Sequence, residues 1–146
     1  MHIEGDFRVR APPEKVYAFF LDPVGFIDCL DDPHQVHAVD TDHFEGTVTT
    51  GVAFIRGTFR IRGTYGERTP PTALTARING TGLGSGIDAQ LSIAIAAAEG
   101  QSAVHWQGEV QLSGPVATIG ERMVRSTVDK KADGLFENAR KRLEGA

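Results

Sequence analysis

The C-terminal part of the chain constrains the fold most. Over residues 115–143, apolar side chains recur at steps of three and four residues, which predicts one long amphipathic helix. The segments before it alternate apolar and polar residues and are separated by glycine- and proline-containing turns, which is typical of antiparallel strands. In a chain of 146 residues, a helix this long has to lie across the sheet that these strands form.

The remaining pattern fills in the order of the elements. Residues 2–10 alternate as a half-buried strand, and residues 14–21 and 24–30 predict two short helices bounded by prolines. Further strands are predicted at 35–40, 43–50, 54–68, 73–80, 87–97 and 102–112, with the glycine-rich segment 81–86 as a hairpin connection. We therefore predict an α+β fold in one domain over residues 1–146. It has a curved antiparallel sheet of six to seven strands, two short helices after the first strand, and one long C-terminal helix packed across the sheet.

Composition excludes several classes of protein. Lys and Arg number 15 against 19 Asp and Glu, and this net charge of −4 argues against a nucleic-acid binder. The single cysteine, Cys29, permits no internal disulfide and fits a reducing cytoplasm. Apolar runs fall short of the ~20 residues of a membrane span. We expect a cytoplasmic protein with no integral membrane segment. The basic stripe on the last helix leaves peripheral contact with the inner membrane face open as an alternative.

This architecture predicts a ligand cavity. A twisted antiparallel sheet is concave, and one helix about 10 Å wide does not fill the concavity everywhere. Small residues at inward positions indicate either space for a ligand or close backbone contact, and both interpretations stay open for Gly120, inside the predicted helix. These small residues are Gly5, Gly46, Gly63, Ala76, Ala89, Gly108 and Gly120.

The predicted cavity is lined by apolar residues of the short helices, the strands and the last helix. Thr127, polar on the apolar face of that helix, either orients a ligand oxygen or bonds back to its own helix. The predicted lining comprises Phe26, Leu30, Val48, Phe59, Ile61, Leu74, Ile78, Leu91, Ile93, Trp106, Ile119, Gly120, Met123 and Thr127.

Several segments resemble one known family. The start of the chain over residues 1–7, the segments 11–16 and 21–23, and the glycine-flanked segment 51–59 are similar to the CoxG (G-type subunit) family of carbon-monoxide dehydrogenase. The glycine-rich segment 80–86 and the residues Val104-His105-Trp106, Gly114, Ile119-Gly120 and Phe136-Glu137-Asn138 also match. The resemblance covers nearly the whole chain.

The resemblance implies the helix-grip fold of the START-related, pollen-allergen-like (SRPBCC) superfamily. It also implies a hydrophobic ligand, quinone- or lipid-like, and a role as accessory to a carbon-monoxide-dehydrogenase-like molybdenum hydroxylase. Two features depart from the family. Residues 29–33 read Cys-Leu-Asp-Asp-Pro where members often read Cys-Leu-Pro-Gly-Cys, and the sequence given ends at Ala146 without the C-terminal extension of membrane-recruiting members.

Candidate chemistry is sparse. His34 and His37 lie three residues apart, near Asp31, Asp32 and His43, and on a strand such a pair faces opposite sides, so we predict no metal site. We predict no cofactor and no catalytic residue. Two alternatives to a non-catalytic binding protein stay open. One is a cyclase- or hydrolase-type enzyme using Asp28, His37 or Tyr65, and the other is a protein-interaction module without a ligand.

Overall fold

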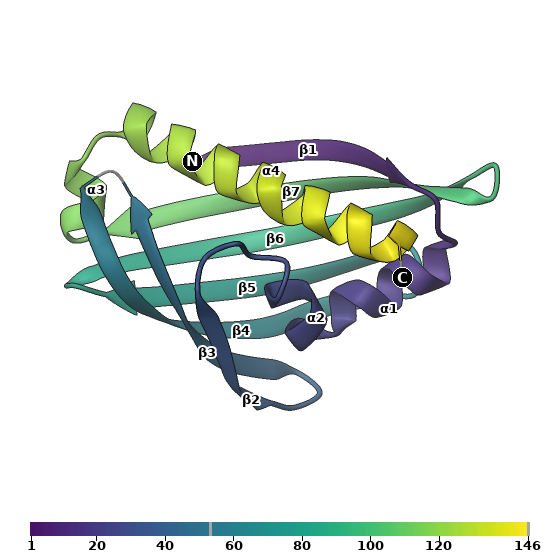
Figure 1. Cartoon of the computed structure of the whole chain (residues 1–146), viewed down its shortest axis with the longest axis horizontal. Coiled ribbons are helices and arrows are strands. Elements are labelled where there is room, and N and C mark those ends of the chain that lie inside the picture. Colours follow the sequence, from purple (N-terminus) through teal and green to yellow (C-terminus); the bar gives the residue numbers. More distant parts are fainter. Residues whose placement is uncertain (53, 146) are drawn as a thin grey trace.

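The computed structural model describes residues 1–52 and 54–145. The chain begins with β1 (His2–Val9), α1 (Pro13–Leu21) and α2 (Pro23–Ile27). Six strands follow: β2 (His34–Val39), β3 (His43–Val52), β4 (Ile55–Thr69), β5 (Ala73–Gly82), β6 (Ser85–Ala98) and β7 (Gln101–Ser113). Two helices, α3 (Pro115–Thr118) and α4 (Glu121–Gly145), end the chain (Figure 1).

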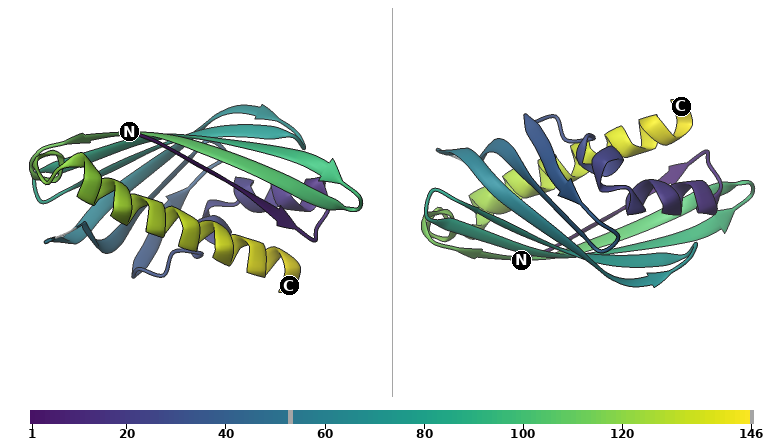
Figure 2. Two further views of the ribbon diagram at one scale, coloured as in Figure 1. Left: turned by 90° about the horizontal axis from the view of Figure 1, so that it is seen from above. Right: turned by 90° about the horizontal axis from the view of Figure 1, so that it is seen from below.

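The strands form one antiparallel sheet in the order β1-β7-β6-β5-β4-β3-β2. The first strand in the chain therefore pairs with the last one, and β2 forms the opposite edge. Helix α4 crosses one face of the curved sheet diagonally, and α1 and α2 lie on that same face near its C-terminal end (Figure 2). The predicted helix-grip architecture is confirmed, with seven strands.

Aromatic side chains join the helices to the sheet. The ring of Phe136 on α4 stacks on Trp106 of β7, with ring centroids 4.5 Å apart and an interplanar angle of 16°. Phe20 of α1 and Phe26 of α2 lie 6.1 and 6.0 Å from Phe136. All four side chains are at most 8% exposed, and we call this group the aromatic core. It fixes the C-terminal half of α4 on the sheet.

The predicted connection over residues 81–86 is shorter in the structure. Strand β5 continues to Gly82 and β6 begins at Ser85, so the turn consists of Leu83 and Gly84 alone. Both have positive φ, 53° and 74°, as a two-residue hairpin turn that follows the strand twist requires. The glycines that looked like a loop are therefore largely strand residues.

The prediction of one helix over residues 115–143 is wrong at its start. Ile119 and Gly120 separate α3 from α4, and Gly120 has a φ of +110°, outside the helical region. A Cβ at Gly120 would meet nothing within 4 Å, so the glycine serves the backbone turn and neither of the two interpretations considered for it. Because α4 starts anew at Glu121, its buried face begins at Val124, and Met123 is 54% exposed instead of facing inward.

Candidate binding surface

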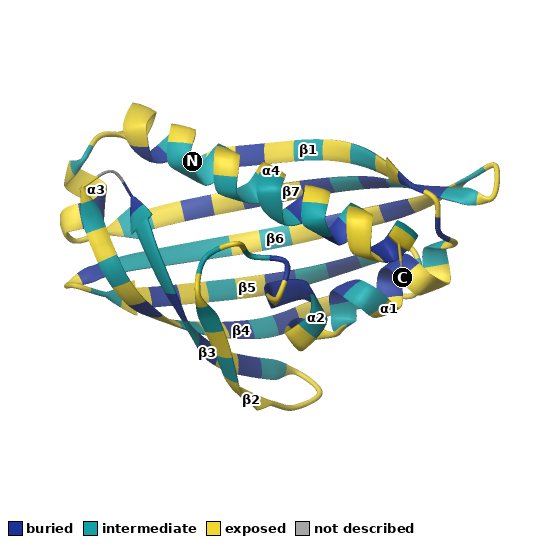
Figure 3. Cartoon of the chain, viewed as in Figure 1, coloured by how far each residue is buried: buried dark blue, intermediate teal, exposed yellow. Residues whose placement is uncertain are grey.

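The inner face of the sheet has two closed cores with a half-buried region between them (Figure 3). The aromatic core lies toward α1 and α2. A second, smaller core joins Val52, Val116 and Val124 at the opposite end. Between them lie partly buried apolar side chains, which we call the inner apolar band: Ile61, Ile78, Ile87, Ala89, Leu91 and Leu112 from the strands, and Val128, Ala132 and Leu135 from α4.

Strand β6 shows where the close packing ends. Ile93 and Ile95 point inward beneath the short helices and are 2% and 3% exposed. Ile87, Ala89 and Leu91 point to the same face but keep intermediate exposure. Alternation puts all five on one side of the strand, so the difference comes from what covers them. Helix α4 packs chiefly along β1, and the inner faces of β4, β5 and β6 are covered less completely.

A polar bridge closes one side of this region. Lys131 of α4 donates from Nζ to Oδ2 of Asp32 over 2.7 Å, and Oγ1 of Thr50 on β3 donates to the same oxygen over 2.9 Å. We call these three residues the rim bridge. Partial burial acts to raise the pKa of Asp32, but the hydrogen bonds from Lys131 and Thr50 outweigh it and hold that pKa below its usual value.

The loop that carries Asp32 is held to α4 at two further points. Asn138 donates from Nδ2 to the carbonyl oxygen of Cys29 over 2.8 Å, and Arg142 pairs with Asp28 over 2.6 Å. The segment between α2 and β2 therefore spans from the short helices to the terminal helix. This is the segment in which the sequence departs from the family pattern.

Inward glycines in the strands serve close packing, which overturns the idea that they leave space for a ligand. A Cβ at Gly5 would lie 2.7 Å from Cζ2 of Trp106, and one at Gly63 would overlap the ring of Phe44. The same holds at Gly46, against the carbonyl of Gln35, and at Gly108, against Ile3. The volume next to these glycines is already occupied by large side chains or by backbone.

The structure divides the predicted lining residues among several places. Ile61, Ile78 and Leu91 belong to the inner apolar band. Ile119 contacts the second core, Leu30 contacts the larger one, and Gly120 and Met123 are exposed. The remaining apolar residues are buried: Phe26, Val48, Phe59, Leu74, Ile93 and Trp106.

Two tyrosines bring hydroxyl groups to the inner face. Tyr65 donates from its hydroxyl to the carbonyl of Phe20 over 3.0 Å, and burial raises its pKa to about 12. The hydroxyl of Tyr17 on α1 is buried and has no hydrogen-bond partner among the described residues. A buried polar atom without a partner requires an explanation, and a ligand oxygen is one. Tyr17 was not among the residues predicted from the sequence, although its place between Val16 and Phe20 in the first predicted helix was a usable signal.

Other polar candidates lie apart. Thr127 donates from Oγ1 to the carbonyl of Met123 over 3.3 Å, the bond back to its own helix. Asp28 and His37 are exposed at the surface, and Tyr65 is buried, so the three residues considered for an enzyme do not converge. His34 pairs with Asp28. Within residues 1–52 and 54–145, no group of three or more His, Cys, Asp or Glu residues is placed to hold a metal ion.

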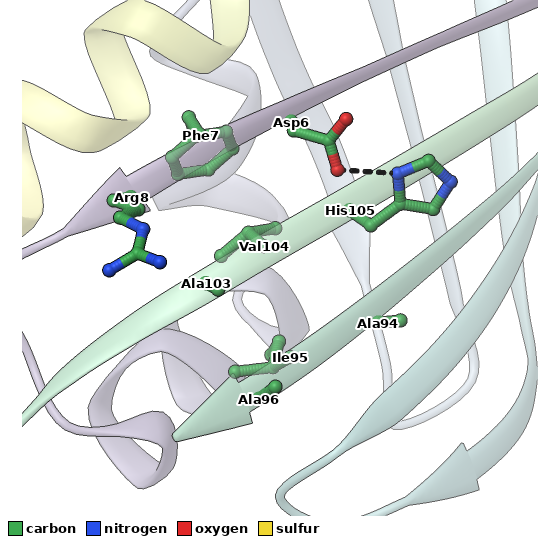
Figure 4. A pocket seen from close by; sticks show the side chains of 9 residues that line it. All are labelled: Asp6, Phe7, Arg8, Ala94, Ile95, Ala96, Ala103, Val104 and His105. Carbon is green, nitrogen blue, oxygen red and sulfur yellow. Dashed lines mark hydrogen bonds and ion pairs between the residues drawn. The ribbon is translucent and has the colours of Figure 1, made fainter. Parts of the chain in front are cut away.

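A hollow of about 530 Å³ lies on the outer face of the sheet (Figure 4). Asp6 accepts from Nδ1 of His105 over 2.7 Å at its edge, and its floor is shallow because it is formed by the small side chains of Ala94, Ala96 and Ala103. As the alternation of β7 predicted, His105 points away from the inner face. This hollow is separated from the inner apolar band by the sheet itself.

Within the part of the chain that the structure describes, no helix has both the length and the apolar composition needed to cross a membrane.

Comparisons with known proteins agree on the architecture. A conserved protein from Geobacillus kaustophilus superposes with a TM-score of 0.88 at 18% identity, covering 98% of this chain and 95% of that one. Protein CV1439 from Chromobacterium violaceum gives 0.75 at 15% identity, covering 98% and 97%. Ara h 8.0201 gives 0.68 at 15% identity, also covering 98% and 97%.

A search of the sequences of curated proteins finds no match. The family model for CoxG, the G-type subunit of carbon monoxide dehydrogenase, matches residues 5–144. This match confirms the family and superfamily that the sequence motifs indicated. The chain belongs to the carbon monoxide dehydrogenase CoxG family.

Proposed function

We propose that this protein binds a hydrophobic, quinone- or lipid-like molecule between the sheet and α4, against the inner apolar band. The observation that supports it is the partial exposure of Ile61, Ile78 and Leu91 on a face whose two ends are closed. Interiors are normally packed to the density of organic crystals. Inward aliphatic side chains that remain in contact with water therefore favour an apolar occupant.

The energetics are sufficient for micromolar binding. Each 100 Å² of apolar surface removed from water contributes roughly 2.5 kcal/mol. An isoprenoid or acyl chain along the band would cover side chains from three strands and from α4. About 300 Å² of such contact would offset the cost of immobilising a small ligand and leave a favourable balance. The rim bridge would then close over the ligand on the β3 side.

Membership of the CoxG family supports a role as accessory to a carbon-monoxide-dehydrogenase-like molybdenum hydroxylase. In this role the protein carries its ligand to or from the enzyme and catalyses no reaction itself. The buried, reduced Cys29 fits a cytoplasmic location. Deletion of the gene should lower electron transfer from such an enzyme to the quinone pool. An unchanged rate would contradict the accessory role without affecting ligand binding.

Ligand binding is tested with a matched pair of variants. Leu91 and Ser92 are neighbours on β6 and point to opposite faces, the first half-buried in the band and the second exposed. Leu91→Trp fills the band, while Ser92→Trp adds the same side chain outside. Native mass spectrometry and calorimetric titration with a short-chain quinone and with palmitate are the measurements.

We expect the wild-type protein and Ser92→Trp to bind one of these probes, and Leu91→Trp to bind it at least tenfold more weakly. Absence of binding by the wild-type protein, or equal binding by both variants, would contradict the proposal. Circular dichroism of the two variants separates loss of the ligand from loss of the fold.

A further inference from the structure

We propose that the end of the molecule formed by the β3–β4 turn, the β5–β6 turn and the start of α4 docks on an anionic lipid bilayer. Three large apolar side chains project there: Phe54 is 83% exposed, and Leu83 and Met123 are each 54% exposed. They come from three separate elements that lie at one end of the sheet, opposite the aromatic core (Figure 1). We call this surface the apolar tip.

Contacts hold these elements together as one surface. The side chain of Leu83 lies over Gly57 of β4, where an added Cβ would be 2.7 Å from Cδ1 of the leucine. The β3–β4 hairpin is fixed to the terminal helices because Val52 shares the second core with Val116 and Val124. Phe54, Leu83 and Met123 therefore project from a common, supported base.

Charge distinguishes this end from the rest of the chain. The segments 50–57, 81–86 and 113–125, which build the tip, hold Arg56, Arg122, Arg125 and one acidic residue, Glu121. Their net charge is 3 − 1 = +2, whereas the whole chain carries −4, so the remainder carries −6. Arg56 and Arg122 form no ion pair with any described residue, and their guanidinium groups are available to lipid phosphates.

The shape of the tip favours a bilayer over a folded protein. A protein interface needs a surface that is complementary over its whole area, whereas a fluid bilayer accepts separate side chains at any spacing. One phenylalanine at a turn, two aliphatic neighbours and unpaired arginines together supply both apolar insertion and attraction to anionic headgroups. The inference extends the proposed function, since a carrier of a membrane-soluble molecule has to reach the membrane.

The experiment is co-sedimentation with vesicles of phosphatidylcholine, with and without phosphatidylglycerol. The wild-type protein should bind the anionic vesicles and be released by salt. Phe54→Ser combined with Leu83→Ser should weaken binding at least tenfold, and Arg122→Gln should weaken it on anionic vesicles only. Val39→Ser is the matched control, because Val39 is 49% exposed but lies by the β2–β3 turn, at the other end of β3.

Three outcomes would overturn the inference. They are the absence of vesicle binding by the wild-type protein, an equal effect of Val39→Ser, and retention of vesicle binding when the tip is changed. Loss of binding to the molybdenum hydroxylase by the tip variant, without vesicle binding by the wild-type protein, would assign the tip to a protein partner instead. Calorimetric ligand affinity should be unchanged in the tip variant, so failure of docking and failure of ligand binding are distinguishable.

Discussion

Replacing Gly5 by alanine should destabilise the protein by displacing Trp106. The new Cβ would lie 2.7 Å from Cζ2 and 2.8 Å from Nε1 of the indole, closer than carbon atoms approach one another in packed interiors. Overpacking of this kind costs about 1–3 kcal/mol. Movement of the indole also weakens its stacking on Phe136, which contributes about 0.5–1.5 kcal/mol.

Alanine also lowers the entropy of the unfolded chain, which returns about 0.4–1 kcal/mol. The balance is a loss of about 2 kcal/mol in the free energy of unfolding. Urea denaturation followed by circular dichroism measures it, and near-ultraviolet dichroism of the single tryptophan reports on the displaced ring.

Gly80→Ala is the matched control for this prediction. Gly80 is also buried in the sheet, but a Cβ there would lie 3.9 Å from its nearest neighbours, an ordinary contact. The free energy of unfolding of this variant should stay within about 0.5 kcal/mol of the wild-type value. If Gly5→Ala were equally neutral, the view that the inward glycines are filled by large side chains would be refuted.

Three other substitutions test separate features. Tyr65→Phe should cost about 1 kcal/mol of unfolding free energy because it leaves the buried carbonyl of Phe20 without its donor, whereas Tyr17→Phe should be neutral or stabilising; a larger loss at Tyr17 in urea denaturation would contradict the absence of a partner for its hydroxyl. The pKa of Asp32 is lower in the folded than in the unfolded protein, so its ion pair stabilises the fold above the unfolded pKa, and that stability is lost as the pH falls through the folded pKa, below about pH 4. Asp32→Asn should therefore cost about 0.2–1 kcal/mol at neutral pH and nothing in strong acid, and a pH-independent difference in melting temperature would be inconsistent with this account. Gly120→Ala should cost about 1–2 kcal/mol because alanine disfavours a φ of +110°, and unchanged thermal stability would show that the helix break does not need this conformation.

Much of the fold follows from local patterns in the sequence. Alternation placed all seven strands, and the prolines at positions 12, 13 and 23 placed the two short helices, because both signals act within a few residues. The break at Gly120 was not predicted. A glycine inside a helical pattern can stay helical at modest cost, and only the path of the chain from β7 to α4 decides that it turns instead.

The candidate site was harder to predict for a different reason. Alternation tells which side of a strand a residue faces, and it correctly put Ile61, Leu91 and Ile93 on the inner side. It does not tell how far a covering helix reaches, so Ile93 is closed off while Leu91, two residues away, is not. The same limit explains the small inward residues. Whether Gly63 leaves a space depends on Phe44, which lies on a neighbouring strand.

The central claim is that the inner apolar band between the two cores holds an apolar molecule. Nuclear Overhauser contacts between a bound short-chain quinone or fatty acid and the methyl groups of methyl-labelled protein test it most directly. We predict contacts from the ligand to Ile78, Leu91 and Val128, and none to the methyl groups of Ala94 and Ala96 on the outer face. Contacts confined to the outer face, or a saturating ligand that leaves these three residues unaffected, would contradict the account.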